Sequence, residues 1–186
     1  MRKLIVFNSV SLDGYFTDSH SDMSWAHKQD PEWMAFVQEN ARRGGELVFG
    51  RKTYEMMASF WPTPQAIQTM PEVAKGMNES PKVVFSKSLE RASWKNTRLF
   101  KGDPAGDVRK LKNESGPDMV IFGSGTIISQ LAPHGLVDEY QFVVCPIVLG
   151  DGRTMFDGVP NKLNLKRAST RTFTNGNVLL TYQPAS

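Results

Sequence analysis

Short apolar runs alternate along the chain with segments that begin like helices, and this alternation constrains the fold more than any other feature of the sequence. Four of the runs are typical of buried strands: residues 4–10, 46–49, 82–85 and 119–122. An Asp cap followed by Pro, as at Asp103-Pro104, marks the start of a helix between them. Strands that alternate with helices favour an α/β fold with a mostly parallel sheet, covered by helices on both faces.

The expected helices have recognisable boundaries. The first begins at Asp30-Pro31 and runs to about Arg42, where two glycines end it. A second begins at Gly50, a further one is expected over residues 71–77, and the helix opened at Asp103-Pro104 runs to about Asn113. Residues 60–71, which contain several prolines, are expected to be irregular.

The C-terminal part of the chain has a different pattern. A long strand is expected over residues 138–149, and two further β-type runs, 163–173 and 177–182, are joined at Asn175-Gly176. Asn-Gly between two such runs is a strong hairpin signal, so we expect an antiparallel hairpin beside the parallel strands. No repeat, low-complexity tract or linker divides the 186 residues, which indicates a single domain over residues 1–186.

The composition excludes several classes of function. With 40% hydrophobic and 22% charged residues the chain is of ordinary globular type, and a net charge of +3 spread along it disfavours a nucleic-acid partner. One cysteine, Cys145, allows no internal disulfide, and three scattered histidines lack metal-ligand spacing. The apolar start is too short for a membrane span or a secretion signal, so we expect a cytoplasmic protein without a membrane partner.

Three junctions at the ends of expected strands are rich in Gly, Ser, Thr and basic residues. They are Gly50-Arg51-Lys52-Thr53, Ser86-Lys87-Ser88 and Gly123-Ser124-Gly125-Thr126. In a parallel sheet all three lie at the carboxyl edge, where open α/β sheets bind ligands and helix N-termini present free N–H groups to phosphates. Each junction alone also suits an ordinary turn. The P-loop, the G-x-G-x-x-G fingerprint and the G-x-S-x-G nucleophile motif are all missing.

Five segments taken in order, SLDGY, GRKTYE, VVFSKSL, IFGSGTIISQL and LVDEYQFVVCPIVLGDGRTMF, together with Trp25, resemble the dihydrofolate-reductase-like superfamily. The resemblance is closest to the reductase domain at the C-terminal end of bifunctional riboflavin-biosynthesis deaminase-reductases and to its free-standing bacterial relatives. It covers nearly the whole chain, and GRKTYE and the segment from VDEY to GDG are its most specific parts. It implies a three-layer fold, a homodimer and NADPH as the hydride donor.

The resemblance also implies roles for the junction residues. Arg51 and Lys52 would contact cofactor phosphate, Thr53 the pyrophosphate, and Ser86 with Lys87 the adenosine 2′-phosphate, whose charge needs a cationic partner. The remaining cofactor contacts would be Gly50, Gly123, Ser124, Gly125 and Thr126, with Ser9 and the backbone of Tyr15 and Phe16 beside the nicotinamide. Dihydrofolate reductases have a Gly-Gly pair where this chain has Gly123-Ser124, and this departure puts the close approach of backbone and cofactor in doubt.

Two carboxylates are candidate proton donors. Asp30 follows Trp25 by the same five positions that separate a tryptophan from the acid of dihydrofolate reductase, although Asp30 before Pro31 is equally well explained as a helix cap. Asp13 stands at the mouth of a long polar loop that runs to about Lys28, where Asp-Gly is also a common turn. Trp25 is a candidate wall for a flat substrate, although core packing is the routine use of tryptophan.

The sequence therefore predicts an NADPH-dependent reductase acting on a small heterocyclic or sugar-imine or carbonyl substrate, similar to 5-amino-6-(5-phosphoribosylamino)uracil reductase. Three alternatives stay open: a nucleotide-binding protein without turnover, a dihydrofolate or pterin reductase, and a flavin-using or phosphoribosyl-handling enzyme on the same fold. We expect no deaminase domain, and the physiological substrate does not follow from the residues.

Overall fold

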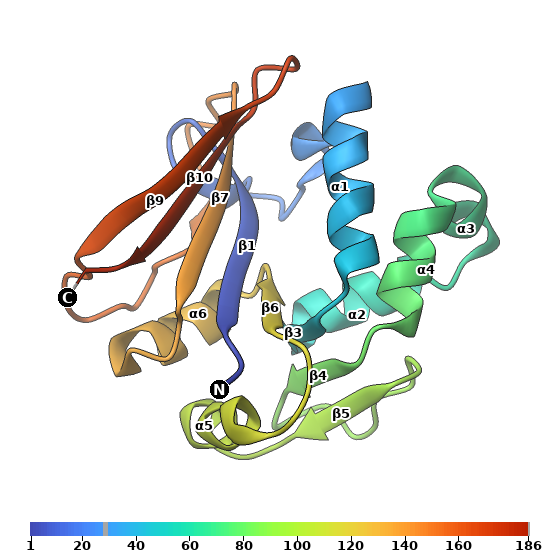
Figure 1. Cartoon of the computed structure of the whole chain (residues 1–186), viewed down its shortest axis with the longest axis vertical. Coiled ribbons are helices and arrows are strands. Elements are labelled where there is room, and N and C mark those ends of the chain that lie inside the picture. The colour runs from blue at the N-terminus through green and yellow to red at the C-terminus, as the bar shows by residue number, and fades with distance from the viewer. Residues whose placement is uncertain (28–29, 186) are drawn as a thin grey trace.

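The structure is a computed structural model that describes residues 1–27 and 30–185, and within them an eight-stranded sheet forms the middle layer (Figure 1). The strand order is β5-β4-β3-β6-β1-β7-β10-β9. Neighbours from β5 to β7 pair in parallel, and β10 pairs antiparallel with β7 and β9. The strands are β1 (Leu4–Ser11), β3 (Glu46–Gly50), β4 (Lys82–Phe85), β5 (Thr97–Phe100), β6 (Met119–Phe122), β7 (Glu139–Cys145), β9 (Leu165–Thr172) and β10 (Val178–Pro184).

Helices cover both faces of this sheet. Alternate residues of β3 separate the layers, because Leu47 and Phe49 pack into the cluster of α2 and α4 whereas Val48 packs into that of α5 and α6. Helix α1 lies beside α4 on the first of these faces (Figure 1). The α-helices are α1 (Pro31–Arg43), α2 (Arg51–Phe60), α3 (Pro64–Thr69), α4 (Pro71–Glu79), α5 (Pro104–Asn113) and α6 (Gly125–Leu131), and the short 3-10 helices are η1 (Ser24–Ala26) and η2 (Ala132–His134). No helix within residues 1–27 and 30–185 is long and apolar enough to span a membrane.

The predicted helix starts and the hairpin are confirmed in detail. The Asp30 carboxylate accepts a hydrogen bond from the Trp33 amide (3.0 Å), and the Asp103 carboxylate accepts one from Gly106 (2.8 Å), as caps do. The β9–β10 hairpin closes over Asn175-Gly176, with Gly176 at φ +89°. The α/β fold with a mostly parallel sheet and a C-terminal antiparallel hairpin is therefore as the sequence predicts.

Some elements differ from the prediction. Residues 60–71 are not irregular throughout, because the Thr63 hydroxyl caps α3 and Pro64 begins it, the same kind of signal that opens α1. The strand expected to reach 149 ends at Cys145, where Pro146 has no N–H to continue the ladder. The sequence analysis also missed the short strand β5 and the helix α6. The end of the polar loop near Lys28 lies outside the described residues.

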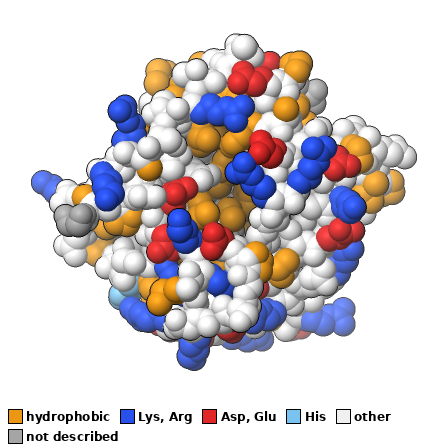
Figure 2. Space-filling view, in the orientation of Figure 1, with side chains coloured by type: hydrophobic (Ala, Val, Ile, Leu, Met, Phe, Trp, Pro, Cys, Tyr) orange, Lys and Arg blue, Asp and Glu red, His pale blue; other side chains and the backbone are white. Residues whose placement is uncertain are grey.

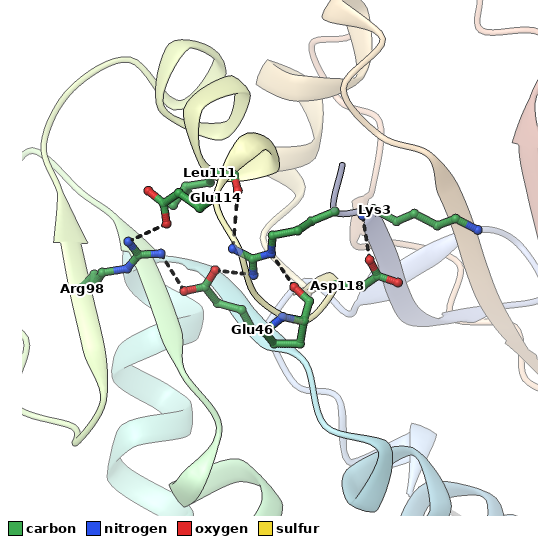
Figure 3. Close-up of polar contacts among 8 residues, drawn as sticks. Lys3, Glu46, Arg98, Leu111, Glu114 and Asp118 are labelled. Atoms are coloured by element: carbon green, nitrogen blue, oxygen red, sulfur yellow. Dashed lines mark hydrogen bonds and ion pairs between the residues drawn. The ribbon is translucent and has the colours of Figure 1, made fainter.

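Buried charges join the amino ends of the strands (Figure 3). Glu46, at the start of β3, pairs with Arg2 (2.7 Å) and with Arg98 of β5 (2.9 Å), and Arg98 also pairs with Glu114 (3.0 Å). The side chains of Arg2 and Glu46 are only 6% and 4% exposed. Arg2 further donates to the carbonyl oxygen of Pro117, so this residue before β1 is held by a carboxylate and by backbone. The network fixes one edge of the sheet.

Figure 2 shows the face seen in Figure 1 as atoms. Hydrophobic side chains gather in a central hollow, and Lys, Arg, Asp and Glu side chains surround it.

We predict that Glu46→Ala lowers the free energy of unfolding by about 3–5 kcal/mol, because it leaves the buried Arg2 without its carboxylate. Glu114→Ala is the matched control, since it removes a carboxylate from the same Arg98 at a site 45% exposed; we expect a loss of about 0–1 kcal/mol. Urea unfolding of the two variants tests this. Equal losses for both would show that burial of the pair is not what stabilises this edge.

Candidate active site

A cleft of about 510 Å³ lies at the carboxyl edge of the sheet, and the three predicted junctions meet in it. β3, β4 and β6 are neighbours in the sheet and parallel, so their ends open to the same side. The junction residues that line the cleft are Gly50, Arg51, Lys52, Thr53, Ser86, Lys87, Ser88, Ser124, Gly125 and Thr126. A sequence pattern spread over some eighty positions thus becomes one cavity, within the usual size range of ligand pockets.

Ser124 connects two of the junctions. Its hydroxyl accepts a hydrogen bond from the Gly50 amide (2.7 Å) and donates one to the Thr53 hydroxyl (3.0 Å). Ser124 adopts the left-handed conformation, φ 64° and ψ 59°, which costs a residue other than glycine about 1–2 kcal/mol. Ser124 stands where dihydrofolate reductases have the second glycine of a pair. Here its hydroxyl has a structural function, because it positions the end of β3 against the start of α6.

The first turn of α2 offers backbone N–H groups to the cleft. The Gly50 amide is satisfied by Ser124, and the helix has no side-chain cap. The next three residues, Arg51, Lys52 and Thr53, all line the cleft, and the first amides of a helix have no partner within it. Such a helix start is suited to bind an anion.

Among the described residues that line the cleft, every ionisable side chain is a cation. These side chains are Arg51, Lys52, Lys87 and Arg153. Arg51 pairs with Glu55 one turn along α2 (3.2 Å), and both side chains are more than two-fifths exposed, so solvent weakens this pair. The cleft therefore has a positive character that favours a ligand with several phosphate charges.

The Ser86 hydroxyl shapes the turn after β4. It accepts hydrogen bonds from the amides of Leu89 (2.9 Å) and Ser88 (3.3 Å), while its own amide donates to the Phe100 carbonyl of β5. Lys87, between these residues, is exposed and directed to the same cleft. The turn thus presents one hydroxyl and one ammonium group at the β4 end of the cavity.

Asp13 joins two loops at the mouth of β1. Its carboxylate accepts hydrogen bonds from the amides of Leu149 (3.1 Å) and Gly150 (2.8 Å). A hydrogen bond from Ser11, together with these two amides, lowers the pKa of Asp13 from 3.8 to about 2. Asp13 is consequently ionised at neutral pH and carries no proton to donate.

Asp30 lies at the carboxyl edge but outside the lining of the cleft. Its carboxylate caps α1 and also accepts a hydrogen bond from the Thr174 hydroxyl of the β9–β10 hairpin (2.9 Å). Glu32 accepts from the Thr174 amide (3.2 Å) and pairs with Arg171 (3.6 Å). The capping role, one of the two possibilities for Asp30, is therefore present in the structure, and the hairpin is held against the start of α1.

Four other predicted residues, Ser9, Tyr15, Gly123 and Trp25, do not line the cleft, whereas Phe16 does. Ser9 lies in β1 opposite Val143, and Gly123, at φ +59°, directly precedes the lining residue Ser124. Trp25 is half-buried in η1, where its indole N–H donates to the Asp22 carbonyl (3.1 Å) and its ring packs against the aromatic cluster of α1. The lining of the cleft therefore does not include these four residues.

The sequence analysis missed several residues of the cleft. Arg153, from the short strand β8 (Arg153–Thr154), is one of them, and Gly102 and Pro104 at the start of α5 are others. The only signal for Arg153 was a single basic residue directly after the loop Gly150-Asp151-Gly152. Within residues 1–27 and 30–185, no three His, Cys, Asp or Glu side chains gather as metal ligands would.

A sheet of this order with a ligand cleft at its carboxyl edge defines a dihydrofolate-reductase-like domain. The particular family follows from the sequence: residues 2–179 match the RibD C-terminal domain, and the chain belongs to this family. The predicted resemblance is thereby confirmed. Membership in this family of reductase-like domains supports a reductase-like function.

Similar proteins support the same assignment. The chain is 30% identical over 182 residues to YyaP, an uncharacterised protein of Bacillus subtilis (strain 168), covering 97% of this chain and 94% of YyaP. A putative riboflavin biosynthesis protein from Shewanella sp. PV-4 superposes with a TM-score of 0.71 at 24% identity, over 99% of both chains. Dihydrofolate reductase from Enterococcus faecalis, complexed with NADP(H), gives 0.65 at 14% identity, over 99% of this chain and 97% of that chain. At these identities the two structures show the fold alone.

We predict that Ser124→Ala and Ser124→Gly both destabilise the protein, but to different extents. Both remove the bridge from Gly50 to Thr53 and leave the Gly50 amide without its partner, at a cost of about 1–3 kcal/mol. Glycine also relieves the positive φ, so Ser124→Gly is expected to be more stable than Ser124→Ala by about 1 kcal/mol. Urea unfolding measures both values. Ser124→Gly less stable than Ser124→Ala would contradict the strain at this position.

The lowered pKa of Asp13 gives a pH-dependent prediction. A carboxyl group whose pKa falls on folding stabilises the native state above its unfolded pKa, and the contribution is lost as the pH falls through its folded value. The melting temperature of Asp13→Asn should therefore lie below that of the wild type at pH 7. This gap should narrow between pH 4 and about pH 2. Thermal unfolding across this range is the measurement, and a gap independent of pH would be inconsistent with an ionised anchor.

Proposed function

We propose that this protein is an NADPH-dependent reductase that transfers hydride to a small heterocyclic, sugar-imine or carbonyl substrate. The observation that carries the proposal is the cleft itself, in which four cations and the start of α2 converge at the carboxyl ends of three parallel strands. A dinucleotide with a 2′-phosphate has negative charge at two separate places and needs such a distribution of partners. Family membership and the fold shared with an NADP(H)-binding reductase support the same reading.

The cofactor is proposed to lie along the edge from β4 to β1. Ser86 and Lys87 would bind the adenosine 2′-phosphate, Arg51 and Lys52 would bind phosphate from the side of α2, and Thr53 would contact the pyrophosphate. The remaining contacts are assigned to Gly50, Ser124, Gly125 and Thr126 in the lining and to Gly123 directly before Ser124. Ser9, Tyr15 and Phe16 would border the nicotinamide.

The residues present fit such a cofactor. Phe16, Phe85 and Ile127 give the cleft apolar surface between its polar groups, as aromatic bases and a nicotinamide ring require. Gly123, at φ +59°, allows the turn from β6 into the junction at Ser124, and a Cβ atom there would lie in ordinary contact with Thr53, 3.4 Å from its methyl group.

NADPH, when bound, supplies hydride to a carbon of the substrate, and the chain must then place a proton on the adjacent nitrogen or oxygen. Asp13 is a poor candidate, because its pKa of about 2 leaves it ionised. We propose Asp30 for this step, at the start of α1 beside the turn of the β9–β10 hairpin. Trp25, in the segment between β1 and α1, is proposed to border a flat substrate ring.

One observation favours a second candidate function, a nucleotide-binding protein without turnover. Both oxygens of the Asp30 carboxylate are engaged, one by the Trp33 amide and the other by the Thr174 hydroxyl. Binding of NADPH that no pyrimidine, pterin or carbonyl compound oxidises would favour this alternative. The homodimer implied by the resemblance stays a prediction.

We predict that the wild type binds NADPH more tightly than NADH and that Lys87→Ala removes this preference. The variant should weaken NADPH by about tenfold or more and leave NADH almost unchanged, because only NADPH carries the 2′-phosphate. Titration with tryptophan and nucleotide fluorescence measures both affinities.

Lys166→Ala is the control for this titration. Lys166 is an exposed cation of β9, the outermost strand on the side of the sheet away from β4. Its removal changes the net charge by the same amount as the removal of Lys87. If Lys87→Ala and Lys166→Ala lower the affinity for NADPH equally, only the overall charge of the protein matters. If Lys87→Ala lowers the affinities for NADPH and NADH equally, the assignment of Lys87 to the 2′-phosphate is wrong.

A further inference from the structure

A small ribbon outside the main sheet supplies one residue of the cleft. β2 (Tyr15–Thr17) pairs antiparallel with β8, and Thr17 stands opposite Arg153. β8 lies more than twenty-five residues beyond the last of the three junctions in sequence, yet Arg153 lines the same cavity as Lys87 and Arg51. Its position therefore comes from the packing of the ribbon.

The ribbon packs against the start of α6. A Cβ atom on the buried Gly125 would lie 3.5 Å from the carbonyl oxygens of Thr154 and Met155 and from the ring of Phe16. These contacts come from both strands of the ribbon or the residue directly after it. They place Arg153 next to the junction from Gly123 to Thr126, at the end of the cleft away from Lys87.

The charge of Arg153 is not neutralised by an acidic side chain among the described residues. In the part of the chain that the structure describes, no carboxylate lies within ion-pair distance of it, whereas Arg51 in the same cleft pairs with Glu55. The two acids nearest to it in sequence bond elsewhere: Asp151 accepts from the Gly152 amide, and Asp157 accepts from the Thr154 hydroxyl. The guanidinium instead lies 5.7 Å from the centre of the Phe16 ring, which holds the side chain without cancelling its charge.

We infer that Arg153 is a cofactor-binding residue whose guanidinium binds the pyrophosphate of the dinucleotide, an inference that rests on the proposed function. β4 and β6 are two strand spacings apart, about 10 Å, so the turn that carries Lys87 and the junction beside Arg153 meet different parts of an extended ligand. Lys87 is assigned to the 2′-phosphate, which NADH lacks. The pyrophosphate is common to NADPH and NADH, and the planar guanidinium can donate two parallel hydrogen bonds to it.

Arg153→Met tests the inference in the full chain, because methionine keeps an unbranched apolar stem against Phe16. We expect the affinities for NADPH and NADH to fall together, each by about ten- to a hundredfold, the value of one charge-assisted contact. The salt dependence of binding should also become shallower, since one ionic contact is lost. Arg153→Lys keeps the charge but loses the planar guanidinium, so its affinities for the two nucleotides should lie between those of the wild type and of Arg153→Met.

Arg167→Met is the matched control, an exposed arginine of β9 without an ion pair among the described residues; it should leave both affinities unchanged. If the wild type binds both nucleotides and Arg153→Met binds them equally well, the inference is wrong and the proposed function stands. A loss confined to NADPH would likewise overturn it, because it would move Arg153 to the 2′-phosphate. If the wild type binds neither nucleotide, the proposed function fails and the inference fails with it.

Discussion

The arrangement of the sheet depends on the ion pairs that the buried carboxylate of Glu46 makes. It holds Arg2 before β1 and Arg98 in β5, two segments that the sheet order separates by three strands. A parallel sheet gathers all strand starts at one edge, and the carbonyl groups at the ends of preceding helices have no partners there. Arg2 donates a hydrogen bond to the carbonyl oxygen of Leu111, and Lys82 donates one to that of Asn78. These cations therefore hold the ends of helices against the starts of strands.

The opposite edge has the reverse chemistry. Helix starts lie there, with amides in place of carbonyls. Among the described residues, the ionisable side chains that line its cleft are all cations, of which Arg51 also pairs with Glu55. Ser124 shows how closely this edge is built, because its hydroxyl satisfies one amide of the α2 start and its backbone accepts strain to do so. The amides and cations that remain face the cleft. The same topology thus produces one edge held by buried ion pairs and one edge that carries the cleft.

The sequence predicts the part of this arrangement that is local. Apolar runs, Asp-Pro caps and the Asn-Gly turn predict strands, helices and hairpin, because each depends on a few neighbouring residues. The three junctions could also be predicted, since parallel strands bring their ends together. Arg153 could not, because its place depends on a two-residue strand packed on Gly125, a contact that no periodicity marks. The same holds for the pairing of Asp13 with the loop at Leu149, which joins positions more than a hundred residues apart.

The two candidate proton donors, Asp13 and Asp30, both have structural contacts in this protein. The sequence offers these two carboxylates as proton donors, and the structure uses both to hold segments together: Asp13 joins the β1 loop to the segment after β7, and Asp30 joins α1 to the hairpin. Each also has a hydroxyl among its partners, Ser11 for Asp13 and Thr174 for Asp30. The hydrogen bonds to Asp13 stabilise its anion and lower its pKa to about 2, so Asp13 orients the two loops better than it releases a proton. The proton-donor role proposed for Asp30 therefore has to coexist with the contacts that its carboxylate makes to α1 and to the hairpin.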